Sequence, residues 1–151
     1  MTNAPITQAM VLAAGLGTRL RPITDTMPKP LVSVSGKPMI DYGLDALADV
    51  GVTHAVVNVH HFADRMEAHL AAYPRLEIIV SDERAQLMNS GGGLKQGLSL
   101  LIPGFVFVMN ADLFWIGEKR PHTREVPVLT LKRNTCTCQQ FGVLTAQLIF
   151  P

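Results

Sequence analysis

The sequence lacks several features that would place it in common classes of protein. Its 151 residues include two cysteines, Cys136 and Cys138, which are too few for a zinc site and too close together for an easy disulfide. We therefore expect free thiols in a reducing cytoplasm. Charge of one sign is not in excess, because 13 lysines and arginines face 12 aspartates and glutamates. This balance gives no electrostatic reason to expect nucleic acid or a membrane surface as a partner.

Long apolar runs and two common nucleotide-binding signatures are missing too. No apolar run approaches the roughly 20 residues needed to cross a bilayer, and residues 1–8 lack the basic flank and apolar core of a secretory signal. The pair Gly36-Lys37 is followed by proline rather than by serine or threonine, which argues against a P-loop. Leu20 stands where a dinucleotide-binding fingerprint needs its third glycine, which argues against a Rossmann-type dehydrogenase.

The strongest chemical pattern lies in residues 9–31. An apolar run is followed at once by Gly15 and Gly17, where backbone N–H groups can approach a polyphosphate closely because glycine has no Cβ. Arg19 adds forked donors with a fixed positive charge. Lys29 is a single ammonium group held between two prolines that restrict the backbone. Each of these parts suits a phosphate-rich ligand.

The same residues resemble the signature of a known family. The pattern G-x-G-T-R-x-x-P-x-T, here residues 15–24, followed by Pro-Lys-Pro-Leu at residues 28–31, is similar to that of the sugar-1-phosphate nucleotidyltransferases (nucleotide-sugar pyrophosphorylases). A later segment, Ser90-Gly91-Gly92-Gly93, looks most like the N-acetylmuramate-1-phosphate uridylyltransferase branch and its mannose-1-phosphate guanylyltransferase-like neighbours. Consecutive glycines could let backbone groups contact a base edge or a phosphate, although a flexible loop is the plainer alternative.

Apolar periodicity indicates strands that alternate with helices. Strands are expected over residues 9–14, 55–59, 76–80 and 105–109, helices over 38–50, 62–73 and 91–101, a turn-rich connector over 32–36 and a polar loop over 81–89. This alternation predicts an α/β fold with a mostly parallel sheet and right-handed crossovers. The resemblance implies the Rossmann-like, three-layer α/β/α form of the nucleotide-diphospho-sugar transferases, incomplete at the C-terminus. Ligands bind outside the carboxyl ends of strands in such sheets, so the glycine-rich loop and Asp112 should share one edge.

The resemblance implies a role for each candidate residue. Arg19 and Lys29 are the expected catalytic groups, with Arg19 on the β- and γ-phosphates and Lys29 on the α-phosphate. Asp112 ends an apolar strand and matches the family's magnesium-binding aspartate, although such a residue can also simply cap a turn. The expected nucleotide-binding set is Leu12, Ala13, Gly15, Gly17, Thr18, Gly91 and Gly92.

The implied reaction joins a nucleoside triphosphate to a sugar 1-phosphate and releases pyrophosphate. The attacking phosphate is already an anion, so positioning and charge neutralisation with Mg²⁺ can supply most of the catalysis without a general base. UTP with N-acetylmuramate 1-phosphate is the first expectation. The alternatives are mannose 1-phosphate with GTP, and glucose 1-phosphate with dTTP or UTP. A rival of another class is a non-catalytic fragment that only binds a nucleotide.

Several other residues are weaker candidates. The resemblance makes Gln86, near Glu83 in the predicted polar loop, a weak candidate for a base contact, because many family members use a glutamine near this position. Lys37 is expected to be an ordinary surface lysine. His60 and His61 follow a strand, and we expect them to be structural or solvated rather than metal ligands.

The resemblance covers residues 8–133 and stops there. We therefore divide the chain into a nucleotidyltransferase part, 1–133, and an atypical tail, 134–151, whose apolar run at 141–150 has some strand-like alternation. Family members are longer and carry a second magnesium aspartate and most sugar contacts in their later part. We expect the tail to come from a truncated or frameshifted product, which puts the activity of this polypeptide in doubt.

Overall fold

The computed structural model describes residues 5–113, 128–132 and 135–139. In chain order the elements are β1 (Gln8–Leu12), the 3-10 helices η1 (Thr18–Leu20), η2 (Ile23–Asp25) and η3 (Lys29–Leu31), β2 (Ser33–Val34), β3 (Lys37–Pro38), α1 (Met39–Asp49), β4 (His54–Val59), α2 (Ala63–Ala71), β5 (Glu77–Asp82), α3 (Ser90–Ser99), β6 (Val106–Asn110), β7 (Val128–Lys132) and β8 (Thr135–Gln139). Within the described residues, no helix is both long and apolar enough to span a bilayer.

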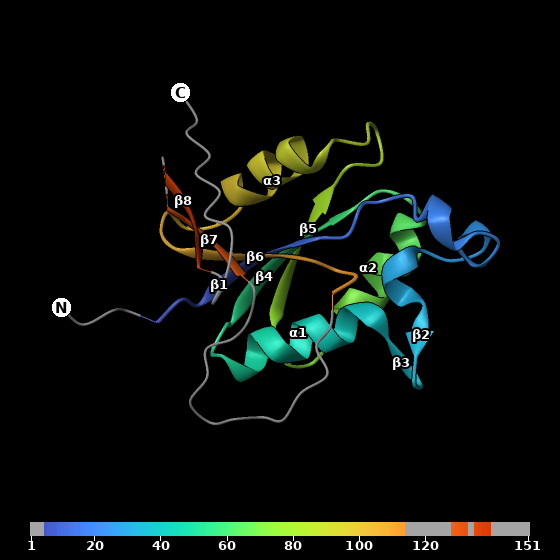
Figure 1. Ribbon diagram of the computed structural model, residues 1–151, viewed down its shortest axis with the longest axis horizontal. Helices are drawn as coiled ribbons and strands as arrows, with labels where there is room; N and C mark the ends of the chain where they lie inside the picture. The colour runs from blue at the N-terminus through green and yellow to red at the C-terminus, as the bar shows by residue number, and fades with distance from the viewer. Residues whose placement is uncertain (1–4, 114–127, 133–134, 140–151) are drawn as a thin grey trace.

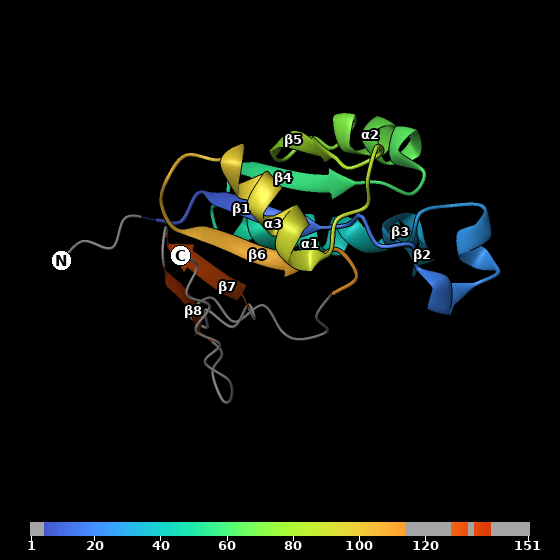
Figure 2. The ribbon, with the colours of Figure 1, turned by 90° about the horizontal axis from the view of Figure 1, so that it is seen from above.

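The large sheet has six strands in the order β5-β4-β1-β6-β7-β8 (Figure 2). The first four of these are parallel neighbours, and β7 and β8 extend the sheet as antiparallel strands. Parallel neighbours cannot be joined by a tight hairpin, so each pair needs a crossover connection. Helix α1 joins β1 to β4 and α2 joins β4 to β5, whereas α3 carries the chain from β5 back to β6 on the other side of β1. The predicted mostly parallel, Rossmann-like sheet is confirmed.

The period-2 alternation of β1 divides the core into two layers. Ala9 and Val11 are fully buried in a cluster with the apolar faces of α1 and α2. Met10, between them, points to the other face and belongs to a second cluster, against which Leu94 and Leu98 of α3 pack. Figure 1 shows α3 on one side of the sheet and α1 on the other. Both faces of the central strand are thus covered, which explains its continuous apolar run.

Two predicted boundaries on the cleft side of the sheet were wrong. The first strand ends at Leu12 rather than at residue 14, because the N–H of Ala13 leaves the ladder and donates to a side chain of β4. Strand β5 runs on to Asp82, so the predicted loop is shorter at its start, where Ser81 is buried in the ladder with Asn58.

The glycine triplet lies inside a helix. It forms the first turn of α3, which begins at Ser90, one residue before the start of the helix predicted over 91–101, and the flexible-loop alternative was wrong. Asn89 caps this helix and accepts a hydrogen bond from the N–H of Gly92 at 2.8 Å. An asparagine cap stabilises a first turn that three glycines would otherwise weaken.

The connector between the glycine-rich loop and α1 has its own small structure. Strands β2 and β3 pair antiparallel around a two-residue turn at Ser35 and Gly36, both with positive φ. Positive φ at both positions is the geometry of a tight hairpin turn. Of the predicted tail, 135–139 forms β8, which contains both cysteines, and the run at 141–150 lies outside the described residues.

Candidate functional site

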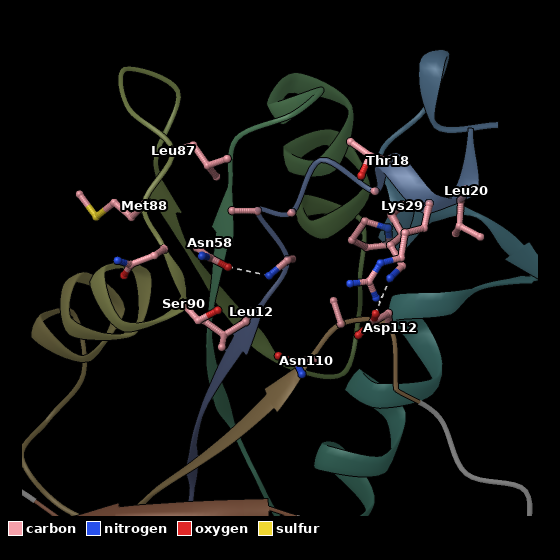
Figure 3. Close-up of a pocket in the computed structure, with 18 residues that line it drawn as sticks. Leu12, Thr18, Leu20, Lys29, Asn58, Leu87, Met88, Ser90, Asn110 and Asp112 are labelled. Atoms are coloured by element: carbon pink, nitrogen blue, oxygen red, sulfur yellow. Dashed lines mark hydrogen bonds and ion pairs between the residues drawn. The ribbon is translucent and has the colours of Figure 1, made fainter. Parts of the chain in front are cut away.

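A cleft of about 510 Å³ lies at the carboxyl ends of β1, β4 and β6, between the glycine-rich loop and the start of α3 (Figure 3). It is lined by Leu12, Ala13, Ala14, Gly15, Gly17, Thr18, Arg19, Leu20, Lys29, Pro30, Asn58, Leu87, Met88, Asn89, Ser90, Asn110, Ala111 and Asp112. Eight of the ten predicted site residues are in this set. Gly91 and Gly92 are not, and Asn89 and Ser90 line the cleft in their place.

The glycine-rich loop is held in shape by Thr24. The hydroxyl of Thr24, which is 2% exposed, donates to the carbonyl of Gly17 at 2.9 Å. Gly17 has φ +65°, and a Cβ there would stand 2.9 Å from side-chain carbons of both Thr24 and Lys29. Only glycine meets both demands without strain. The loop is therefore fixed against the segment that carries Lys29.

Two histidines after β4 contact the backbone of neighbouring loops. The ring of His61 lies 3.1 Å from the carbonyl oxygen of Thr24, and the ring of His60 lies 2.7 Å from that of Glu83. Both contacts use a ring nitrogen, so each ring is held against the backbone of a loop. Within the described residues, no three histidine, cysteine or acidic side chains gather to hold a metal ion. The predicted structural role for His60 and His61 fits this arrangement.

Lys29 and Asp112 form an ion pair on the loop side of the cleft. The ammonium Nζ donates to the carboxylate Oδ2, and the two side chains are 30% and 37% exposed. Figure 3 shows both side chains converging from η3 and from the end of β6. The pair joins positions 83 residues apart in the chain. An exposed pair of this kind contributes only about 0–1 kcal/mol, so a ligand can replace either partner.

The carboxylate of Asp112 fits a magnesium ion only in company with a ligand. Mg²⁺ usually binds one or two carboxylates and completes its octahedron with water and substrate phosphates. Asp112 lines the cleft beside the glycine-rich loop, where phosphates would lie. The donor set in the described residues therefore suits magnesium carried in by a polyphosphate rather than a preformed all-protein cage.

A buried hydrogen-bond network forms the floor and the opposite side of the cleft, and no sequence motif indicated it. The amide oxygen of Asn58 accepts from the N–H of Ala13 at 2.6 Å, and its amide nitrogen donates to Glu83 Oε1 at 2.7 Å. The second oxygen of Glu83 accepts from the N–H of Met88 at 3.0 Å. Asn58 is 4% exposed and Glu83 is 2% exposed. One recognisable signal was the single polar residue inside the apolar strand β4.

The loop between β5 and α3 is also held in place by ion pairs. Arg84 forms ion pairs with Glu67, Asp82 and Asp64 within 2.6–2.9 Å. Hydrogen bonds to these carboxylates, the one to Glu67 most of all, raise the pKa of the Arg84 guanidinium. Gln86 is exposed in this loop and does not line the cleft.

Lys37 lies outside the cleft and is paired. It forms an ion pair with Asp45 and stands 4.6 Å from the ring centre of Tyr42. Burial would raise the pKa of the Asp45 carboxyl, but hydrogen bonds from Lys37, Tyr73 and Arg75 hold it below its usual value. This cluster links α1 to its neighbours and is structural.

Comparison with known proteins agrees with this geometry. The sequence model of the family described as "Nucleotidyl transferase" matches residues 8–120. The N-acetylmuramate alpha-1-phosphate uridylyltransferase of Caulobacter vibrioides is 55% identical over 122 residues, which are 77% of this chain and 49% of that protein. The enzyme of the same name from Neisseria meningitidis is 41% identical over 109 residues, or 70% of this chain and 47% of that protein.

Solved structures show the same fold. A UDP-glucose pyrophosphorylase crystallised with UDP-glucose superposes with a TM-score of 0.68 at 21% identity, over 77% of this chain and 49% of that one. The chain spans about half the length of the curated relatives it matches. The matched region contains every residue that lines the cleft. The chain therefore belongs to the nucleotidyl transferase family.

Proposed function

We propose that the cleft binds a nucleoside triphosphate and transfers its nucleotidyl group to a sugar 1-phosphate, with UTP and N-acetylmuramate 1-phosphate as substrates. The observation that carries this proposal is the convergence of the glycine-rich loop, Lys29 and Asp112 at one edge of the sheet. The 55% identity to a uridylyltransferase supports the choice of substrates. The proposed reaction takes place in the cytoplasm, where nucleoside triphosphates are available.

The glycine-rich loop would hold the triphosphate. Gly15 is exposed at the cleft and has open space where a side chain would be, so its backbone can come close to a phosphate. Gly17 and Thr18 continue this surface into η1, which carries the exposed Arg19. Arg19 neutralises the β- and γ-phosphates, where its forked donors match the phosphate geometry.

The chemical step is an in-line displacement at the α-phosphorus. A phosphate oxygen of the sugar 1-phosphate forms the new P–O bond, the bond to the β-phosphate breaks, and pyrophosphate leaves. Lys29 exchanges Asp112 for the α-phosphate and neutralises the charge that develops there. Because the nucleophile is an anion at neutral pH, no residue has to remove a proton from it.

Asp112, once released by Lys29, is the residue that would hold magnesium beside the phosphates. The ion supplies charge neutralisation and fixes the position of the phosphate oxygens. The position of Asp112 is fixed by the fold, because it follows the buried Ala111 just after the end of β6.

The far side of the cleft would hold the nucleoside. Leu12 and Ala13 provide its floor, and Leu87 and Met88 provide partly exposed apolar side chains. Gly91 and Gly92 remain predicted base contacts, although the N–H of Gly92 is already donated to Asn89.

Pyrophosphate release tests the proposal directly. The purified chain with Mg²⁺ should release pyrophosphate from UTP and N-acetylmuramate 1-phosphate, faster than from GTP with mannose 1-phosphate or from dTTP or UTP with glucose 1-phosphate. Binding of UTP without product would favour the alternative, a nucleotide-binding fragment. The absence of both binding and product would refute the proposal.

A further inference from the structure

Glu83 is a buried carboxylate that the proposed chemistry does not use. It follows β5 directly and is held by its backbone, since its N–H donates to Val59 at 2.8 Å and its carbonyl accepts from Gln86 at 3.1 Å. The His60 ring contacts the same carbonyl oxygen. With only 2% of the residue exposed, the carboxylate has a fixed position and no access to a ligand.

The two oxygens of Glu83 connect opposite parts of the cleft. Oε1 accepts from the side chain of Asn58, whose own oxygen accepts from Ala13 on the floor. Oε2 accepts from the N–H of Met88 on the far wall. The carboxylate is therefore the central acceptor of one continuous chain from Ala13 to Met88. It also fixes which way the Asn58 amide points, because only one orientation gives Glu83 a donor and Ala13 an acceptor.

The first turn of α3 packs directly on this pair. A Cβ at Gly93 would stand 2.7 Å from both the amide nitrogen of Asn58 and Oε1 of Glu83. Gly93 is buried in the helix turn that follows the cleft-lining residues Asn89 and Ser90. Floor, wall and helix are thus positioned by the same carboxylate.

We propose that Glu83 is a positioning residue that sets base selectivity, by holding the floor at Ala13 and the wall at Met88 in one relative position. The inference rests on the proposed nucleotide binding. In this arrangement Glu83 carries the negative charge at a buried position, and Asn58 presents only a neutral amide to the cleft. A negative charge at position 58 would stand nearer the triphosphate.

The change Glu83→Gln tests this because it cannot satisfy the network. A glutamine has one acceptor and one donor at its end, whereas both Asn58 and Met88 present donors. Rotation of the Asn58 amide does not help, because its NH2 group would then face the N–H of Ala13. One donor therefore faces another donor in every arrangement, which should loosen the wall.

The exchange Asn58→Asp with Glu83→Gln restores every hydrogen bond. The new amide at position 83 would donate to the new carboxylate at position 58 and accept from Met88. That carboxylate would still accept from Ala13. The pattern is conserved, and only the charge moves to the cleft. A purely structural role predicts that Glu83→Gln loses stability at an unchanged base ratio. A positioning role predicts that the ratio changes in Glu83→Gln and returns in the double variant.

The readout is the ratio of dissociation constants for UTP, CTP, GTP and ATP, each with Mg²⁺, measured by calorimetry alongside amide hydrogen exchange at Met88. In Glu83→Gln we expect the preference of the parent for its best base to fall about tenfold and the Met88 amide to lose protection. In the double variant the ratio and the protection should return, while all four triphosphates bind more weakly because of the added charge. Glu77→Gln, at the other end of β5 and exposed, is the matched control and should change neither.

Two results would overturn the inference. One is an unchanged base ratio in Glu83→Gln that folds as the parent does. The other is a double variant that folds without regaining the ratio, or that does not fold at all, since it keeps every hydrogen bond at issue. If the parent itself binds none of the four triphosphates, the proposed function fails as well, and that result is recognised before any variant is compared.

Discussion

The two sides of the cleft are built in opposite ways. On the loop side, Lys29 and Asp112 are each about one-third exposed and form a single hydrogen-bonded ion pair. On the wall side, Asn58 and Glu83 are almost fully buried and hold their neighbours by hydrogen bonds of 2.6–3.0 Å. On the loop side, a ligand can replace either partner of the ion pair. On the wall side, any movement of Asn58 or Glu83 would break a buried hydrogen bond.

The difference follows from what each side would have to do. An exposed ion pair contributes about 0–1 kcal/mol, so phosphates and a cation can separate it at little cost. A buried polar group left without its partner costs about 1–3 kcal/mol, so each bond on the wall side resists change. Substitutions on the loop side should therefore change chemistry with little change in stability, and those on the wall side should change stability and selectivity.

The largest effect is expected from Lys29→Ala. Loss of the ammonium group should lower turnover by about 100-fold, because a charge-stabilising donor is removed from the transition state. Nucleotide affinity should fall much less, since the loop and Arg19 remain. Steady-state kinetics and UTP binding give the two quantities. Lys37→Ala, a paired lysine outside the cleft, is the control, and equal turnover in Lys29→Ala and the parent would remove Lys29 from the mechanism.

On the wall side, Gly93→Ala should cost about 1–3 kcal/mol of unfolding free energy, because its Cβ would overlap the Asn58–Glu83 pair. Chemical denaturation measures this change. Gly104→Ala is the matched control, because the nearest atom to its Cβ would be 4.0 Å away. Equal unfolding free energies for the two variants would mean that the residues around Asn58 and Glu83 can shift to accept a Cβ, which contradicts a rigid wall side.

Asp112→Asn tests the loop side through the metal. The magnesium concentration for half-maximal rate should rise about tenfold, because an amide oxygen replaces a charged ligand while the stability of the fold is nearly unchanged. A magnesium titration of pyrophosphate release gives the number. A titration identical to that of the parent would exclude Asp112 as the ligand. A large loss of stability would contradict the claim that loop-side residues contribute little to the stability of the fold.

The smallest effect is expected outside the cleft, at Asp45. Its folded pKa is lowered, so the ionised carboxyl stabilises the fold above the ordinary value of 3.8, and this contribution is lost as the pH falls through the folded value. Asp45→Asn should cost about 1 kcal/mol at pH 7, since the cluster is partly exposed. The stability gap between parent and variant should close in acid. A gap that persists below the folded pKa would assign the effect to packing instead.

How much the sequence could predict follows the same division. Gly15, Gly17, Arg19 and Lys29 lie within one short stretch, so their spacing predicted a common phosphate site. Asp112 was placed at the same edge by its position after an apolar strand in a parallel sheet, and its role with magnesium was implied by the family resemblance. These residues are recognisable because cations, glycines and a strand-end carboxylate indicate phosphate chemistry wherever the chain folds.

Asn58 and Glu83 could not be found in this way. They are 25 residues apart and belong to no shared motif, and Glu83 stands in a polar segment where a carboxylate looks solvated. Only the register of β4 against β5 brings the two side chains together. Within the glycine triplet, Gly91 and Gly92 were predicted to be functional, whereas Gly93 is the one that packs against Asn58 and Glu83.

Amide chemical shifts during titration test the two-sided cleft most directly. With Mg²⁺ present, UTP should shift the amides of both Gly15 and Met88, whereas pyrophosphate should shift Gly15 and leave Met88 in place. A UTP titration that moves only one of the two amides, or pyrophosphate that moves Met88 as far as UTP does, would contradict the division of the cleft into a phosphate side and a base side.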